Sequence, residues 1–256
     1  MISSLIEHVI IAHRGASFEA PENTLAAIQM AWDQGIKAVE IDIHLSKDAY
    51  IVAIHDNTTQ RIGNQNKKVR EQTLKELKVL DVGHWKDPKW LGEKIPTLQE
   101  ILDTIPKDGK LIIELKTYIP PDHLTELLNQ YTFKHHQIEF ISFDLTLITQ
   151  IKVTFPHFRS LLLLDLDYNA QTAKHIPDIE ETLTSVRNAN LDGIDIWAGP
   201  LAKNLWVPLF KNQGLIVYIW TINKPKEALA FFQLGVDGIT TDRAYWLTQK
   251  TKAQFK

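Results

Sequence analysis

The stretch AVEIDI (residues 38–43) is apolar except for two acids, Glu40 and Asp42, which are two positions apart. Side chains of a strand alternate between its faces, so these two carboxylates point the same way. A second strand-like stretch, LIIELK (residues 111–116), carries Glu114 in a similar setting. Charged groups on apolar strands are costly to bury unless they are paired, and a hard divalent ion prefers oxygen ligands. The sequence therefore predicts a metal site rather than an ordinary core.

The composition limits the class of protein. The chain has 256 residues and a net charge of −3, so it lacks the basic excess of a nucleic-acid-binding domain. It contains no cysteine, which excludes disulfides and thiolate metal sites. The first residues, MISSLIEH, show no basic segment followed by a long apolar one, so we expect no secretory signal and a cytoplasmic protein. The run LLLL (161–164) is far shorter than the roughly 20 residues of a membrane span, which predicts no stable membrane insertion.

Strand-like runs alternate with helical patterns through most of the chain. They lie at residues 9–12, 38–43, 111–115, 138–142, 159–164, 192–196, 215–220 and 236–240. A closed β/α barrel needs eight such strands. We therefore predict an α/β fold, a (β/α)₈ TIM barrel that occupies residues 1–256 as a single domain.

One segment breaks the alternation. The turn-like tetrad SKDA (46–49) leads directly into a strand-like run at 50–56, which leaves no room for a helix and predicts a hairpin. In a barrel, this hairpin would return to the mouth and bring His55 close to the acids of the first stretch. Residues from about 57 to 95 then resemble an insertion, which we predict to be a small cap at the barrel mouth. Thr97 and Glu100 restart the alternation with a capping box.

Polar side chains gather where the strands are expected to end, which is where barrel enzymes build their active sites. The set comprises His13, Arg14, Glu40, Asp42, His55, Glu114 and Lys116. Two histidines, three acids and two cations at the ends of apolar strands are hard to explain as a solvated surface. Arginine is suited to binding phosphate or carboxylate through several hydrogen bonds. We therefore predict one active site that contains all seven residues.

Three further residues are considered for the same site. Trp220 ends an apolar run, and we expect it in the pocket wall rather than in the core. Asp242 either caps the next helix or faces the mouth, and both interpretations stay open. His84, beside Trp85 in the insertion, is a minor candidate for lining the site.

Short motifs follow one another in a fixed order along nearly the whole chain. They are HRGA (13–16), PENT (21–24), EIDI (40–43), HD (55–56), IPTL (95–98), IELK (113–116), SF (142–143), WTIN (220–223) and TD (241–242). Each alone is weak, but the ordered set resembles the glycerophosphodiester phosphodiesterase family. Two positions depart from the family pattern. The family usually follows the HD motif with a leucine and then an arginine-threonine pair, of which this chain keeps only Arg61. The proline that usually follows the TD motif is replaced in Arg243-Ala244.

The resemblance implies a (β/α)₈ barrel with a small insertion after the HD motif, and it implies roles for the clustered residues. In that family's pattern, Glu40, Asp42 and Glu114 bind one divalent cation, Mg²⁺ or Ca²⁺. His13 and His55 form the acid/base pair, which we assign as base and acid respectively. Arg14 and Lys116 neutralise the phosphate, and Trp220 packs against the glycerol.

The expected activity is hydrolysis of small-molecule glycerophosphodiesters to sn-glycerol 3-phosphate and an alcohol. The attacking group is either water or, first, a neighbouring glycerol hydroxyl that gives a cyclic phosphate. Three alternatives remain: a lysophospholipase D-type reaction, a non-catalytic glycerophosphate-binding protein, and a barrel enzyme of unrelated chemistry such as a sugar-phosphate isomerase. The sequence leaves the choice of metal, the leaving alcohol and the oligomeric state open.

Overall fold

Eight parallel strands form a closed barrel at the centre of the computed structural model, which describes residues 9–169 and 174–252. The strands are β1 (Val9–Ala12), β2 (Ala38–Leu45), β4 (Lys110–Leu115), β5 (Ile138–Ser142), β6 (Arg159–Leu164), β9 (Gly193–Trp197), β10 (Ile216–Trp220) and β11 (Gly238–Thr241). The barrel closes because β1 pairs with both β2 and β11. The predicted (β/α)₈ barrel is thereby confirmed. The predicted lack of a signal segment falls on residues 1–8, which lie outside the described residues.

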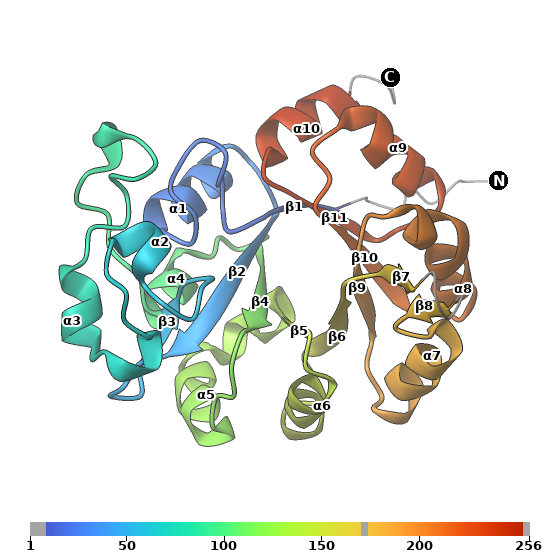
Figure 1. Cartoon of the computed structure of the whole chain (residues 1–256), viewed down its shortest axis with the longest axis horizontal. Helices are drawn as coiled ribbons and strands as arrows, with labels where there is room; N and C mark the ends of the chain where they lie inside the picture. Colours follow the sequence, from blue (N-terminus) through green and yellow to red (C-terminus); the bar gives the residue numbers. More distant parts are fainter. Residues whose placement is uncertain (1–8, 170–173, 253–256) are drawn as a thin grey trace.

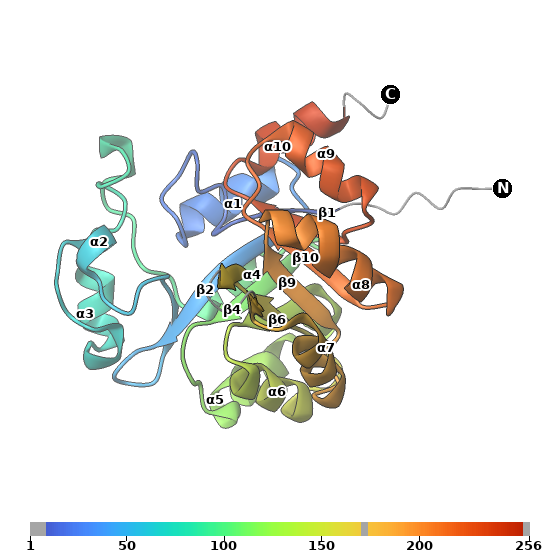
Figure 2. The ribbon, with the colours of Figure 1, turned by 45° about the vertical axis from the view of Figure 1, so that its right-hand side comes forward.

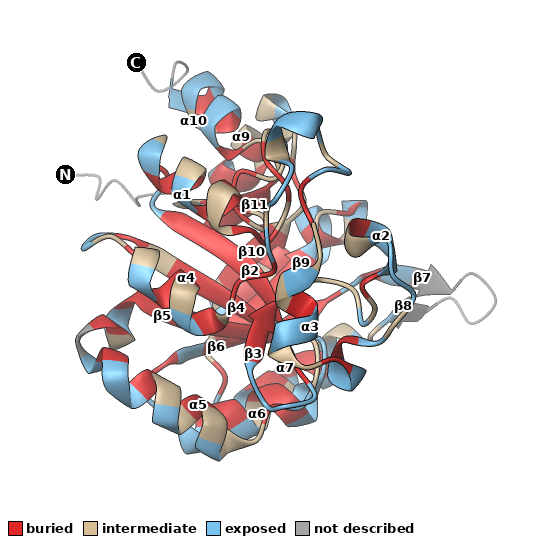
Figure 3. Cartoon of the chain, turned by 90° about the vertical axis from the view of Figure 1, so that its left-hand side faces the viewer, coloured by how far each residue is buried: buried red, intermediate tan, exposed pale blue. Residues whose placement is uncertain are grey.

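Helices surround the barrel in a ring that Figure 1 shows nearly end-on. They are α1 (Leu25–Asp33), α4 (Leu98–Thr104), α5 (Pro121–Leu128), α6 (Leu145–Thr154), α7 (Ile179–Asn188), α8 (Val207–Asn212), α9 (Pro225–Gln233) and α10 (Ala244–Lys252). Figure 3 shows the strands almost wholly buried and the helices buried on one side only, as expected for amphipathic helices that cover a sheet. No helix in the described part of the chain is long and apolar enough to cross a membrane.

The interior of the barrel is a packed core rather than a channel. Its buried apolar side chains are Ile11, Ala38, Ile112, Ile141, Leu161, Leu163 and Tyr218. Gly238 leaves room for the Tyr218 ring, because a Cβ atom there would lie 2.8 Å from its Cδ1. The Tyr218 hydroxyl donates a 2.7 Å hydrogen bond to Glu139, so the one polar atom of this ring is satisfied. This filled interior restricts any ligand to the ends of the barrel.

The insertion follows an antiparallel hairpin formed by β2 and β3 (Ile51–Ala53). It contains α2 (Gln60–Gly63), α3 (Leu74–Val79) and two short 3-10 turns. Its small core includes Ile62, Val69 and Leu77 and packs on the β3 segment. Figures 1 and 2 show α2 and α3 at one side of the ring of helices. Apart from the barrel, β7 (Asp167–Asn169) and β8 (Lys174–Ile176) form a separate two-stranded ribbon.

The insertion touches the mouth at its edge. The Lys86 ammonium donates to the Ser17 carbonyl and the Trp90 indole donates to the Glu19 carbonyl, both in the loop after β1. These contacts place the insertion beside the loop that leads into α1. The insertion therefore lies beside the mouth of the barrel.

The predicted capping box at α4 is present and gives a test of the fold. The Glu100 amide donates to the Thr97 hydroxyl at 3.2 Å, and the Thr97 amide donates to the Glu100 carboxylate at 2.7 Å. Replacing Thr97 by Ala should lower the free energy of unfolding by about 1 kcal/mol, because a partly buried helix end loses an acceptor. Thr97→Ser keeps the hydroxyl and is the matched control. Equal urea midpoints for the two variants would contradict a stabilising cap.

A candidate active site at the carboxyl ends of the strands

A cavity of about 140 Å³ opens at the carboxyl ends of the barrel strands. Its lining residues are His13, Arg14, Glu40, His55, Glu114, Lys116, Ile141, Phe143, Leu163, Asp195, Trp220 and Thr240. Seven of the predicted site residues line it directly: His13, Arg14, Glu40, His55, Glu114, Lys116 and Trp220. The eighth, Asp42, forms ion pairs with two of them. The barrel therefore brings these eight residues to one place.

Three carboxylates form the buried centre of this site. The parallel register of β2 and β4 sets Asp42 opposite Glu114, and Glu40 lies two positions earlier on the same face. One oxygen from each of the three lies within 4.8 Å of the others. Glu40 Oε1 and Asp42 Oδ1 are buried and accept no hydrogen bond from any described residue. Carboxylate oxygens that are buried, close together and unsatisfied fit a hard divalent cation.

The pKa shifts reflect the same crowding. Burial and the neighbouring charges of Asp42 and Glu114 raise the pKa of Glu40 well above its usual value. Burial and the charge of Asp42 also raise the pKa of Glu114, to about 7. Burial alone would raise the pKa of Asp42 as well, but the charges of Arg14, His55 and Lys116 outweigh it and hold that pKa below its usual value. The cluster thus holds more negative charge than the adjacent cations offset.

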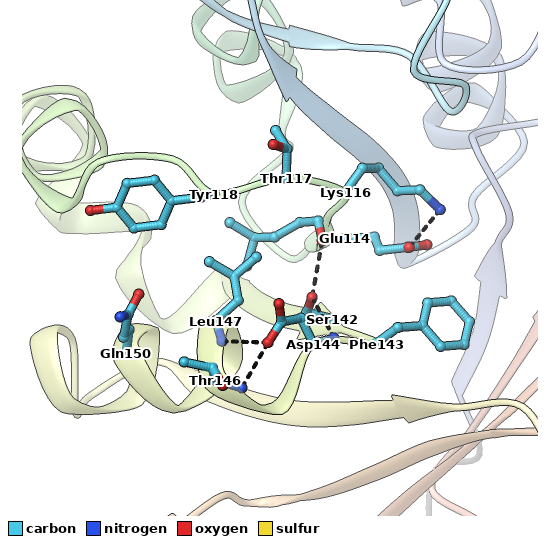
Figure 4. Close-up of a pocket in the computed structure, with 11 residues that line it drawn as sticks. Glu114, Lys116, Thr117, Tyr118, Ser142, Phe143, Asp144, Thr146, Leu147 and Gln150 are labelled. Atoms are coloured by element: carbon cyan, nitrogen blue, oxygen red, sulfur yellow. Dashed lines mark hydrogen bonds and ion pairs between the residues drawn. The ribbon is translucent and has the colours of Figure 1, made fainter.

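Two cations border the carboxylates from opposite sides. Arg14 Nε lies 3.1 Å from Asp42 Oδ2, and the Arg14 amide donates to Glu40 Oε2 at 3.0 Å. Lys116 Nζ lies 2.7 Å from Glu114 Oε1 and 3.6 Å from Asp42 Oδ1. Figure 4 shows the Lys116 side chain extended toward Glu114. Both cations line the cavity, so each is placed to contact an anionic substrate as well.

Asn23 is a site residue that the sequence motifs contained but did not single out. It is buried, with the left-handed φ of +57° that asparagine tolerates. The side-chain Nδ2 of Asn23 donates to Asp42 Oδ2 at 2.8 Å. Its side-chain Oδ1 accepts a 3.1 Å hydrogen bond from the backbone amide of Asp42. The PENT motif before α1 thereby fixes one carboxylate of the buried cluster, on strand β2.

Each of the two histidines is held by a carboxylate. His13 Nδ1 donates to Asp242 Oδ1 at 2.7 Å, and His55 Nδ1 donates to Asp56 Oδ1 at 2.7 Å. With Nδ1 engaged, the Nε2 atom of each ring is the one available to a substrate in the cavity. Burial lowers the pKa of His55 below its usual value. The arrangement gives two oriented imidazoles on the same cavity.

The carboxylates behind the histidines are themselves fixed. Asp242 accepts a 2.7 Å hydrogen bond from the Asn223 amide. Because its other oxygen holds His13 of the cavity, Asp242 faces the mouth, the second of the two positions that its sequence left open. Burial alone would raise the pKa of Asp242, but the hydrogen bonds from His13 and Asn223 and the charges of His13 and Arg14 together outweigh burial and lower that pKa. Arg61 of the insertion donates to Asp56 at 2.8 Å, and this bond lowers the pKa of Asp56 to about 2. Both carboxylates therefore remain ionised at neutral pH.

The remaining wall combines aromatic rings with unsatisfied polar atoms. Trp220 meets Phe143 edge to face, with ring centroids 5.8 Å apart. The Trp220 Nε1 atom is buried and has no hydrogen-bond partner in the described part of the chain. The same holds for Oδ1 of Asp195, a residue only 2% exposed whose pKa burial raises well above its usual value. A ligand with hydroxyl groups would satisfy both atoms.

The sequence did not predict Asp195 and Phe143 as site residues. It named His84 as a candidate, and the structure places His84 elsewhere. His84 is exposed and lines none of the cavities at the mouth. Asp195 lies in the stretch GIDI (193–196), which echoes EIDI (40–43), so a signal for it existed in the repeat. Phe143 belongs to a recognised motif, yet nothing in the sequence placed its ring beside Trp220.

Comparison with known proteins agrees with this geometry. The model of the glycerophosphoryl diester phosphodiesterase family matches residues 13–245. A solved structure of an Oleispira antarctica phosphodiesterase, in complex with the product sn-glycerol-3-phosphate, has a TM-score of 0.80 and 29% identity and covers 95% of this chain and 96% of its own. The glycerophosphodiester phosphodiesterase of Caldanaerobacter subterraneus is 31% identical over 243 residues, 91% of this chain and 93% of that protein. A Homo sapiens lysophospholipase D is 27% identical over 262 residues, 91% of this chain and 82% of that protein.

The chain belongs to the glycerophosphoryl diester phosphodiesterase family. It is an enzyme, a phosphoric diester hydrolase that acts on glycerophosphodiesters. This assignment sets aside the non-catalytic binding protein and the unrelated barrel enzyme, which the sequence had left as alternatives.

The role of Asn23 can be tested by stability. Asn23→Ala should lower the free energy of unfolding by roughly 2–3 kcal/mol, because buried Asp42 loses hydrogen bonds to both its carboxylate and its amide. Asn64 has a similar left-handed φ of +51° but is exposed, so Asn64→Ala measures the backbone cost alone. Denaturant titration compares the two variants. A loss no larger in Asn23→Ala than in Asn64→Ala would mean that the bonds to Asp42 are not stabilising.

Proposed function

We propose that the enzyme hydrolyses glycerophosphodiesters to sn-glycerol 3-phosphate and an alcohol, with one divalent cation and two histidines as acid and base. The observation that carries this proposal is the pair of carboxylate-bound histidines, His13 and His55, on the same cavity as the three-carboxylate cluster. A binding site needs no such pair of oriented imidazoles. General acid–base catalysis of a displacement at phosphorus needs one group on each side.

Glu40, Asp42 and Glu114 would hold the cation, and Mg²⁺ and Ca²⁺ both suit three carboxylate ligands. When bound, the cation supplies charge stabilisation for the phosphoryl oxygens. The two buried oxygens without hydrogen bonds, on Glu40 and Asp42, support this assignment. Arg14 and Lys116 would bind the remaining phosphate oxygens, since both line the cavity next to the carboxylates with which they form ion pairs. Their charges would also stabilise the additional negative charge of the transition state.

The glycerol part of the substrate would pack against the Trp220 side of the cavity. The indole ring offers an apolar face, and its unsatisfied Nε1 offers a donor. Asp195 offers an acceptor on the same cavity. A small triol fits these groups because it presents both carbon-bound hydrogens and hydroxyls.

In the first step of the proposed reaction, His13 acts as the base and His55 as the acid. His13 Nε2 would take the proton of the attacking hydroxyl while its oxygen bonds to phosphorus, and His55 would give a proton to the departing alcohol as the other P–O bond breaks. If the attacker is the neighbouring glycerol hydroxyl, the product of this step is a cyclic phosphate. Water would then open the ring with the two roles exchanged, which leaves both histidines in their starting protonation states. If water attacks first, one step gives the same products.

A lysophospholipase D-type reaction is the second candidate. A cavity of about 280 Å³ adjoins the catalytic one, and its lining includes exposed Tyr118 and Phe143 as well as Leu147 (Figure 4). An acyl chain would pack on such side chains, and the Homo sapiens relative carries the lysophospholipase D name. Trp85 and Trp90 of the insertion, by contrast, line neither cavity. Comparing kcat/KM for long-chain lysophosphatidylcholine and for glycerophosphocholine distinguishes the two reactions.

The cation dependence is tested by adding ions back to EDTA-treated enzyme. Release of glycerol 3-phosphate from glycerophosphocholine should disappear after chelation and return with Mg²⁺ or Ca²⁺. Glu40→Gln should lower kcat by at least about 100-fold with either ion, because it removes one of three charged ligands. Glu93→Gln, on the insertion and outside the cavity, is the matched control. Full activity in the presence of EDTA would exclude the proposed cation.

The histidine roles are tested by changing the leaving alcohol. His13→Ala and His55→Ala should each lower kcat/KM for glycerophosphocholine by roughly 100- to 10,000-fold, the usual range for losing an acid or base. With p-nitrophenol as the leaving alcohol, no proton is needed for departure, so His55→Ala should recover most of the activity while His13→Ala should not. His136→Ala, an exposed histidine, is the control. Recovery in His13→Ala instead would reverse the two assignments.

A further inference from the structure

Besides the cavity of about 280 Å³, a larger cavity of about 570 Å³ lies beside the catalytic one, and we call it the second cavity. It is bounded by the β2–β3 hairpin turn, by the start of the insertion and by the loop after β4. Its lining residues are His44, Leu45, Ser46, Lys47, Asn57, Lys68, Arg70, Lys116, Thr117 and Tyr118. Neither the cation cluster nor the proposed glycerol wall contributes to it, so it is a separate compartment.

The charges in this compartment are all of one sign. Lys47, Lys68, Arg70 and Lys116 line it, and none of its lining residues is an acid. The chain as a whole carries a net charge of −3, so this concentration of cations is local. Lys68 has a distant partner, with its Nζ 3.9 Å from Glu71, whereas Lys47 and Arg70 form no ion pair with any described residue.

The nearest acids along the chain, Asp48, Asp56 and Glu71, form no ion pair with Lys47 or Arg70. Asp48 accepts hydrogen bonds from the Ser46 hydroxyl and from the Leu74 amide, both at 2.8 Å. Asp56 is occupied by His55 and Arg61. The compartment therefore keeps a positive potential, which concentrates anions in a concave site more than on a flat surface.

The compartment lies close to His55, on one side of the proposed phosphate site. Lys116 lines both cavities. His44 lines the second cavity and its Nε2 lies 3.2 Å from the His55 carbonyl oxygen, and Asn57 follows His55 by two residues. Trp220 and Asp195 line the catalytic cavity alone. The second cavity thus lies on the His55 side of the phosphate site, where the leaving alcohol is protonated.

We propose that this compartment binds an anionic group on the leaving alcohol, so that the preferred substrates are glycerophosphodiesters whose alcohol carries its own phosphate or carboxylate. The inference rests on the proposed function, because it uses His55 as the group that faces the alcohol. A choline or ethanolamine alcohol would instead place its cation among four like charges. The shared Lys116 favours a part of the substrate over a separate anion, since it links the compartment directly to the reacting phosphate.

The test compares three diesters that share the glycerophosphoryl group and whose leaving alcohols differ in charge. Glycerophosphocholine has a cationic alcohol, glycerophosphoglycerol a neutral one, and glycerophosphoglycerol 3-phosphate an anionic one. The wild-type enzyme should have the highest kcat/KM for the anionic substrate. Raising NaCl should reduce this preference, because screening weakens attraction between exposed charges.

The double variant Lys47→Gln/Arg70→Gln removes two of the charges without touching the proposed catalytic groups. It should raise KM for the anionic diester about tenfold, leave kcat unchanged, and leave kcat/KM for glycerophosphocholine equal or higher. Lys75→Gln/Lys107→Gln removes two exposed lysines outside the cavity and is the matched control, expected to change neither value.

Other outcomes would overturn the inference. A variant that keeps the wild-type order of the three substrates, or that loses activity equally on all of them, would show that the compartment does not read the charge of the alcohol. Unchanged selectivity combined with lost binding to phosphatidylglycerol vesicles would assign the same cations to a membrane surface. Hydrolysis of glycerophosphocholine with no preference for the anionic diester would defeat this inference alone. No hydrolysis of any of the three would defeat the proposed function and the inference with it.

Discussion

The mutual repulsion of three buried carboxylates is the constraint on which the site depends. Glu40, Asp42 and Glu114 lie together because β2 and β4 pair in a register that puts Asp42 opposite Glu114. Burial makes this arrangement costly, and the structure offsets the cost with Arg14 and Lys116 on either side. Burial and the neighbouring carboxylate charges still raise the pKa of Glu40 and of Glu114. A barrel enzyme can hold such a centre because its eight strands fix the backbone from all sides.

Pairing also organises the two histidines, and it draws on distant parts of the chain. Asp242 directly follows the last strand, β11, and accepts a hydrogen bond from His13, which directly follows the first strand, β1. Arg61 of the insertion bonds to Asp56, which in turn holds His55. One imidazole is thus positioned by the closure of the barrel and the other by the insertion. This division gives the insertion a chemical role even though it stands beside the mouth.

The insertion and the hairpin also set the shape of the mouth on the side of His55. Lys47 on the hairpin turn and Arg70 on the insertion face a compartment that has no acid in its lining. On the other side, Trp220 and Asp195 come from the barrel strands themselves. The part of the site proposed for glycerol is therefore built on the rigid sheet, while the part proposed for the leaving alcohol is built on loops, which are the more variable elements of a fold.

The sequence by itself determined the strands, the hairpin, the α4 capping box and the set of residues at the strand ends, because alternation and capping are local patterns. It also placed Glu40 and Asp42 on one face, since side chains two apart in a strand share a face. Only the tertiary structure decided that Asn23 holds Asp42, that Asp242 turns toward His13 rather than capping a helix, and that Asp195 reaches the cavity. These contacts join residues 19 to 229 positions apart in the chain or depend on barrel closure. Strand register and ring closure fix them, and no local pattern encodes either.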